Sequence, residues 1–193
     1  MKKILILPLI ATAIFANENN TTTKEQMPPV VKEGIKYIKM VGKELKSNVK
    51  AKMQEDKSGV KAAEFCANNA KEVMQKVTKN FPENVKVRRV ALKYRNPNNK
   101  PDSVDLEVLT KMQEALKNQT LQKKPQVVDV NGTKRVYVPL IVEKACLKCH
   151  GDINSMNPQI KKIIAKKYPN DKAVNFKEGD LRGAVVAEIK PKK

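Results

Sequence analysis

The sequence predicts an α+β protein, in which two helices lead into a small antiparallel sheet with further helices inserted among its strands. Two observations predict this class. Apolar residues recur every three or four positions over much of 31–77, as on the buried face of a helix. After residue 84, β-branched runs alternate with turn signals and shorter helical segments. The length of 193 residues is typical of one domain with an appended helix.

The start of the chain has the pattern of a secretory signal. A basic pair precedes an apolar run over residues 4–15, and small residues favour cleavage after Ala16 or after Ala13. The run is shorter than the ~20 residues that span a bilayer. We therefore expect residues 1–16 to be removed, and the mature protein to be periplasmic, with no integral membrane segment.

Helices dominate the first half of the mature chain. Residues 17–29 are polar and end in two prolines, so we expect a disordered lead to a single domain at 30–193. A first helix begins near residue 31 and ends at "EDKSG". A second follows Gly59 and ends before Pro82. The inward face of this second helix is predicted to carry Ala63, Cys66, Ala70 and Val73.

Four β-rich segments follow. "VKVRRVAL" at 85–92 is the first expected strand, and a loop, "RNPNNKPD", separates it from a helix at 104–118 capped by Asp102 or Ser103. That helix should bury Leu106, Leu109, Met112 and Leu116. Asn131-Gly132 predicts a tight hairpin turn between the next two strands. "PQIKKIIAKKYP" and "RGAVVAEIK" predict a final helix and strand.

The charge of the chain is strongly positive. Removing residues 1–16 removes two lysines, which lowers the formal charge from +19 to +17. Such a surface attracts acidic proteins, anionic lipid headgroups or anionic ligands. We do not expect a nucleic-acid partner, because the protein is predicted to be exported and has no run of aromatics among its basic residues.

"KACLKCHGD" at 144–152 contains the pattern Cys-x-x-Cys-His, formed by Cys146, Cys149 and His150. This is the attachment signature of one covalent c-type haem, with two thioether bonds and an axial histidine. The alternatives are a thioredoxin-like redox pair, which lacks its βαβ setting here, and a disulfide with one cysteine left over. The third is a zinc site that includes Cys66, but adjacent residues such as Cys149 and His150 rarely bind one metal together.

The ligand on the other face of the iron is not fixed by the motif. His150 is the only histidine, so a second histidine is excluded. Met156 lies too close to the motif, and the upstream methionines fall on predicted helices, where they usually pack in the core. A lysine, water or a vacant position would also fit. Cys66 is a further candidate, since an unpaired thiol in an oxidising compartment needs an explanation.

Several stretches together resemble the Tll0287-like family, also called DUF3365. They are "AAEFCANNA", "VRRVALKYRNPNNKPD", "VYVPLIVEKACLKCHGD" and "YPNDKAVNFKEGDLRGAVV", which span most of 60–187. The resemblance implies a PAS-like antiparallel sheet with N-terminal helices packed over a c-type haem. It also implies iron ligation by His150 and Cys66. Arg95, Asn96 and Arg182 lie in the matching stretches and are candidate partners of the haem propionates.

Three functions follow from a haem of this kind. The first is an exported sensor of redox state or of a small ligand such as a diatomic gas. The second is a periplasmic electron-transfer cytochrome whose basic surface docks an acidic redox partner. The third is a haem-thiolate enzyme acting on sulfur compounds. It is the least favoured, since the only histidine is committed to iron and no acid-base constellation stands out.

Overall fold

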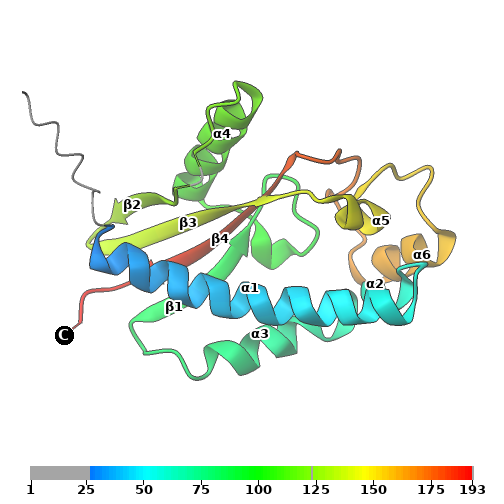
Figure 1. The fold of residues 1–193 in the computed structure, drawn as a ribbon, viewed down its shortest axis with the longest axis horizontal. Coiled ribbons are helices and arrows are strands. Elements are labelled where there is room, and N and C mark those ends of the chain that lie inside the picture. Colours follow the sequence, from blue (N-terminus) through cyan, green and yellow to red (C-terminus); the bar gives the residue numbers. More distant parts are fainter. Residues whose placement is uncertain (1–26, 123, 193) are drawn as a thin grey trace, which may run out of the picture.

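A four-stranded antiparallel sheet forms the centre of the computed structural model, which describes residues 27–122 and 124–192 (Figure 1). The strand order is β1 (Val85–Val90), β4 (Leu181–Ile189), β3 (Thr133–Ile141) and β2 (Gln126–Val130). The predicted antiparallel α+β class is confirmed. The expected signal segment and most of the expected lead lie outside the described residues.

Helix α1 (Pro29–Glu55) covers one face of the sheet. Val31, Ile38 and Val41 pack there against inward residues of β1, β3 and β4. The helix and β3 approach closely at Gly34, where an added Cβ would lie 2.7 Å from a methyl carbon of Val136. A glycine at this position therefore sets the distance between α1 and the sheet.

Helix α4 (Ser103–Lys117) covers the opposite face. Leu109 and Met112 are fully buried against Tyr137 and Val186. The predicted helix is confirmed, but one member of its predicted apolar face is wrong. The Leu106 residue is 50% exposed, because α4 turns the first-turn residue Asp105 towards the sheet instead.

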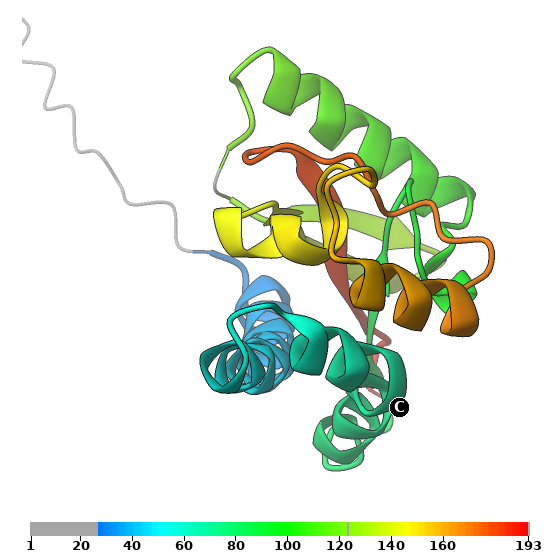
Figure 2. The same cartoon turned by 90° about the vertical axis from the view of Figure 1, so that its right-hand side faces the viewer.

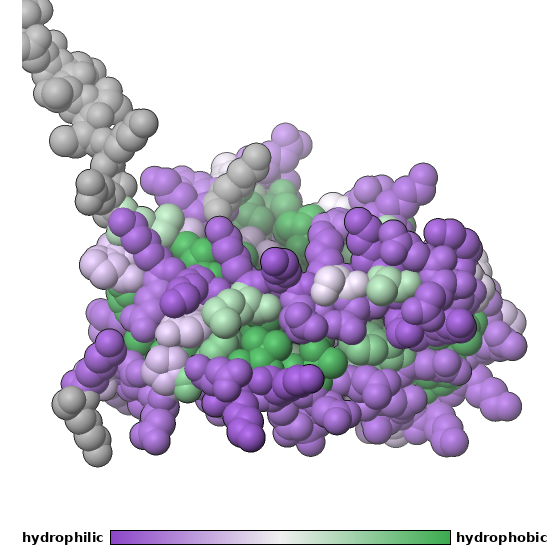
Figure 3. Space-filling view, turned by 60° about the horizontal axis from the view of Figure 1, so that its bottom comes forward, coloured by the Kyte–Doolittle hydropathy of each residue, from purple (hydrophilic) through white to green (hydrophobic). Residues whose placement is uncertain are grey.

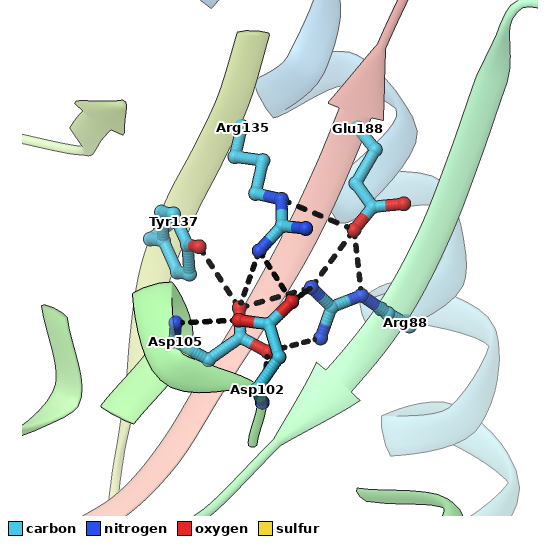
Figure 4. A network of polar contacts seen from close by, with 6 residues as sticks. All are labelled: Arg88, Asp102, Asp105, Arg135, Tyr137 and Glu188. Carbon is cyan, nitrogen blue, oxygen red and sulfur yellow. Dashed lines mark hydrogen bonds and ion pairs between the residues drawn. The ribbon is translucent and has the colours of Figure 1, made fainter. Parts of the chain in front are cut away.

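A network of charged side chains joins the start of α4 to the sheet (Figure 4). Asp105 accepts two hydrogen bonds from the Arg88 guanidinium, at 2.7 and 2.9 Å, and one from the Tyr137 hydroxyl at 2.9 Å. Asp102 and Asp105 also form a reciprocal capping box at the helix N-terminus. Because Asp105 is fully buried, these partners are what makes a carboxylate tolerable at that position.

The second predicted helix is broken into α2 (Val60–Asn68) and α3 (Ala70–Thr78). The break falls at Asn69, whose φ of −112° departs from helical geometry. Asparagine side chains compete with the backbone for hydrogen bonds, so the pair Asn68-Asn69 is a poor helix interior. The sequence-based expectation of one continuous helix was wrong for this local reason.

The remaining elements follow the predicted order. Asn131 and Gly132 have positive φ angles of 51° and 82°, as the expected hairpin turn between β2 and β3 requires. Short 3₁₀ turns η1 and η2 lie at Pro97–Asn99 and Lys144–Cys146, and helices α5 and α6 span Leu147–His150 and Pro158–Lys167.

The face shown in Figure 3 is predominantly polar. Hydrophilic side chains cover most of the face seen in Figure 3, and the apolar residues visible there gather in a band between them. Within the described residues, no helix is both long enough and apolar enough to span a bilayer.

Candidate functional site

A cavity opens between α2, α6 and the segment that carries the Cys-x-x-Cys-His pattern. Helix α2 lies against α6, with α5 beside them (Figures 1 and 2). Small side chains from α2 and α3 form one wall, and polar groups from β1, η1, α5 and β4 face it. The lining residues are Ala63, Cys66, Ala67, Ala70, Arg89, Arg95, Asn96, Asn99, Cys149, His150, Ile164, Tyr168 and Arg182.

His150 is held in one orientation within this cavity. Its Nδ1 lies 2.8 Å from the carbonyl oxygen of Ala173. A carbonyl can only accept, so Nδ1 carries the proton and Nε2 keeps a free lone pair. Burial, followed by the positive charges of Arg182 and Arg95, lowers the pKa of His150 well below its usual value. The imidazole is therefore neutral and oriented, which is the form that binds a metal.

A loop after α6 fixes the backbone around this histidine. The N–H of Phe176 donates to the carbonyl of His150 at 3.0 Å, and the N–H of Asn175 donates to that of Gly151 at 2.8 Å. The Phe176 ring meets the imidazole edge-on, with centroids 6.3 Å apart. The loop and α5 therefore form one rigid unit, although they are more than twenty residues apart in sequence.

The two cysteines of the motif enter different apolar clusters. Cys146 packs beside Val142, Ala173 and Phe176. Cys149 packs between α2 and α6, where burial is the main cause that raises the pKa of its thiol to about 11. Both cysteines are half-buried, and the raised pKa keeps the Cys149 thiol protonated at neutral pH. They lie on either side of a single helical turn, the spacing that two thioether bonds to one porphyrin edge require.

Cys66 is brought to the same cavity, but it is not buried as the helix pattern predicted. Its residue is exposed, because α2 turns it towards the cavity while Ala63 and Phe65 fill the core. Desolvation raises the pKa of the thiol, and the charges of Arg89 and Arg95 oppose this. The thiol is therefore accessible from the same space as His150.

Arg95 braces the motif from within the structure. Its guanidinium donates to the carbonyl of Cys149 at 2.7 Å and to that of Ala173 at 3.1 Å, and pairs with Asp171 at 2.9 Å. Both charged side chains are nearly buried, at 12% and 10% exposure. Nη2 makes these three contacts, and Nε donates to the Asp171 carboxylate at 3.1 Å, so the observed role of Arg95 is to hold the segment that carries His150.

The other predicted polar residues also reach the cavity. Arg182 lies over the Phe176 ring and donates to the carbonyl of Lys93 at 3.1 Å. Burial and the nearby charges of Arg95 and Arg89 lower the pKa of Arg182 to about 10. Asn96 lines the cavity, and its side-chain oxygen accepts from the Asn98 N–H.

Arg89 is a lining residue that the sequence analysis missed. Its Nε is buried and has no hydrogen-bond partner within the described part of the chain. The period-2 alternation of a strand could have found it, because Arg88 faces α4 and its neighbour must face the other side. Three guanidinium groups thus converge on one cavity. Their mutual repulsion favours an anionic ligand between them.

The geometry gives little support to a zinc site or to a methionine ligand. Within residues 27–122 and 124–192, no three His, Cys, Asp or Glu side chains gather as a metal-binding group. Met156 packs in the cluster between α2 and α6, and Met112 is buried under α4. Neither methionine lines the cavity described above.

The fold and the cavity define an α+β protein with a neutral, oriented histidine and an arginine-rich pocket. The chain belongs to the Tll0287-like family, whose sequence profile, Tll0287, matches residues 10–190. A solved structure described as the cyanobacterial heme-protein Tll0287 has the same fold, with a TM-score of 0.61 and 22% identity. The match covers 87% of this chain and 99% of that one. No curated protein matches.

Proposed function

We propose that this protein is an exported, periplasmic haem protein with one covalent c-type haem, bound through Cys146 and Cys149 and ligated by His150. The observation that carries the proposal is the hydrogen bond from His150 Nδ1 to Ala173, which leaves Nε2 free at a cavity lined by three arginines. A solved structure with this fold is described as a heme-protein, which supports haem binding.

The chemistry of the motif and of the cavity lining fits a haem. Each thiol of the motif would add across one vinyl group: sulfur bonds to one carbon and the thiol hydrogen goes to the other, so no oxidant is consumed. The alanine-rich wall of α2 leaves space for a flat ring. The cavity is partly open to solvent and has a volume of about 110 Å³.

We assign the propionate carboxylates to Arg89 and Arg182 first. The Nε of Arg89 lacks a partner among the described residues, and the pKa of Arg182 is lowered by burial and by its cationic neighbours. An anion between the two arginines would accept a hydrogen bond from the Arg89 Nε. It would also offset the electrostatic repulsion between Arg182 and its cationic neighbours. Arg95 and Asn96 line the same wall, but their observed hydrogen bonds brace the protein itself.

Cys66 is the proposed second axial ligand. It opens on the cavity from the helix that faces the motif, and neither Met156 nor Met112 does so. As a thiolate it would place negative charge on the iron, which stabilises the ferric state and lowers the reduction potential. The raised pKa of the free thiol means that ligation, rather than the protein alone, must drive its deprotonation.

We propose that the protein senses redox state or a small ligand such as a diatomic gas. Displacement of Cys66 would release α2 from the haem, and α2 contacts both α1 and α6. Electron transfer to an acidic partner is the second candidate, favoured by the basic surface. A haem-thiolate enzyme is the least favoured, because Tyr168 is the only further acid-base group that lines the cavity within the described residues.

The attachment is tested by replacing both motif cysteines, Cys146→Ala with Cys149→Ala, and measuring haem that survives denaturation. We expect complete loss in the double variant, whereas the matched control Cys66→Ala should retain covalent haem. Covalent haem in the double variant would refute the assignment.

Spectra with and without NO separate sensing from electron transfer. A sensor loses its sixth ligand reversibly, whereas an electron carrier stays six-coordinate.

A further inference from the structure

Helix α1 carries a continuous line of lysines, which we call the lysine stripe. Its members are separated alternately by four and three residues, the spacing of neighbours on one helix face. Over about 27 Å, at 1.5 Å per residue, this line contains one residue type only. The stripe consists of Lys32, Lys36, Lys39, Lys43, Lys46 and Lys50.

The stripe faces away from the protein. With 3.6 residues per turn, the six lysines fall within an arc of about 80°, nearly opposite the buried residues of α1 such as Ile38 and Val41. All six are exposed. Between residues 32 and 50 no other residue of the helix falls in this arc, and Glu33 and Glu44 lie outside it.

Almost none of this charge is neutralised by the protein itself. Lys46 pairs with Glu143 at 2.6 Å, and both side chains remain largely exposed. Among the residues that the structure describes, the other five lysines have no ion-pair partner. α1 runs along the longest axis of the molecule (Figure 1), so the stripe presents a straight basic ridge.

We infer that the lysine stripe docks the protein onto an anionic lipid surface. A straight convex ridge can bring all its ammonium groups to a plane at once, without matching a particular shape. Protein interfaces, in contrast, favour aromatic side chains and arginine and are depleted in lysine, and the stripe contains neither. Lysine is a hydrated point charge suited to headgroup phosphates. The inference does not depend on haem.

The test measures binding of the full chain to vesicles of phosphatidylcholine, alone and mixed with phosphatidylglycerol, by co-sedimentation. The stripe variant replaces three members that have no ion-pair partner among the described residues: Lys32→Gln, Lys39→Gln and Lys43→Gln. The control variant removes the same charge from exposed lysines of α3 and α6: Lys71→Gln, Lys162→Gln and Lys166→Gln. Glutamine keeps the helix propensity close to that of lysine.

We expect the parent to prefer the anionic vesicles, and the stripe variant to lose on the order of 100-fold in affinity for them, at about fivefold per lysine. The control variant should lose far less. Raising the ionic strength from about 0.1 M to about 1 M shortens the screening length from about 10 Å to about 3 Å and should abolish the preference. Any binding through residues 4–15 is common to all variants.

Three results would overturn the inference. Equal losses in both variants would show that overall charge, not the stripe, binds lipid. No preference for anionic vesicles would exclude a lipid partner. Stripe-dependent binding to polyglutamate without such a preference would assign the surface to an acidic protein instead. Unchanged circular dichroism of both variants excludes unfolding as the cause.

Discussion

The ion pair and hydrogen bonds of Arg95 are the contacts whose removal should reveal most about this site. Replacing Arg95 with glutamine removes the cation that pairs with the nearly buried Asp171 and takes a donor from the carbonyls of Cys149 and Ala173. Breaking a buried pair by removing one partner costs ~3–5 kcal/mol, because the other charge stays buried and uncompensated. We expect a loss of that size in the free energy of unfolding.

The sign of the effect separates two roles for this residue. If the main role of Arg95 is to bind an anion, its removal from the haem-free chain should relieve repulsion with Arg89 and Arg182, and stability should rise. If Arg95 mainly holds the motif in place, stability should fall in the haem-free chain as well. The matched control is Arg182→Gln, which removes a guanidinium whose pKa is lowered to about 10 by burial and by its cationic neighbours. We expect this control to be neutral or stabilising.

Urea and thermal unfolding of the haem-free chain measure both variants. At roughly 2–4 °C per kcal/mol for a protein of this size, Arg95→Gln should lower the melting temperature by about 6–20 °C. Adding Asp171→Asn to Arg95→Gln should cost less than the sum of the single changes, because the pair acts as a unit. A loss in the free energy of unfolding below about 1 kcal/mol, the value typical of a surface pair, would refute the idea that Arg95 holds the motif in place.

Three further predictions concern other parts of the chain. Cys66→Ala should keep covalent haem but change the ferric spectrum and raise the reduction potential; spectra identical to the parent would reduce Cys66 to packing. Burial raises the pKa of Asp102, but the backbone hydrogen bond to its carboxylate and the Arg135 guanidinium outweigh this and lower it below 3.8. The ionised carboxylate of Asp102 contributes stability above its usual pKa, and this stability is lost as the pH falls below that value. Asp102→Asn should therefore flatten the acid side of the stability profile measured in urea. An unchanged acid slope would contradict this. Gly34→Ala places a Cβ 2.7 Å from a side chain of β3 and should cost ~1–3 kcal/mol. In Gly42→Ala the added Cβ meets no described residue within 4 Å, so this change should stabilise by ~0.5–1 kcal/mol. Equal melting temperatures for the two variants would contradict the close approach.

Local chemistry allowed the sequence to predict most of the elements. The Asn131-Gly132 turn and the cap at Asp102 depend on contacts within a few residues, and both are where the pattern placed them. The antiparallel α+β class follows from such local signals. The Asn68-Asn69 break is also local, but it is weaker than the apolar periodicity that runs through it, and the single helix predicted there was wrong.

The direction in which side chains face could not be predicted as well. Leu106 was expected in the core, but it lies outside, because the network around Asp105 fixes the rotation of α4. Cys66 follows an apolar stripe, yet it faces the cavity rather than the core. A helix pattern specifies which residues share a face, whereas contacts with the rest of the protein decide what that face meets.

The sequence by itself determined most of the elements, the antiparallel α+β class and the Cys-x-x-Cys-His pattern, since each depends on residues close together in the chain. Only the tertiary structure decided that Arg95, 54 residues before Cys149 in the chain, holds the backbone of that motif. It also placed Arg89 beside Arg182 and fixed the free nitrogen of His150 through Ala173. These contacts join segments distant in sequence, and no local pattern encodes which of many arginines and carbonyls will meet.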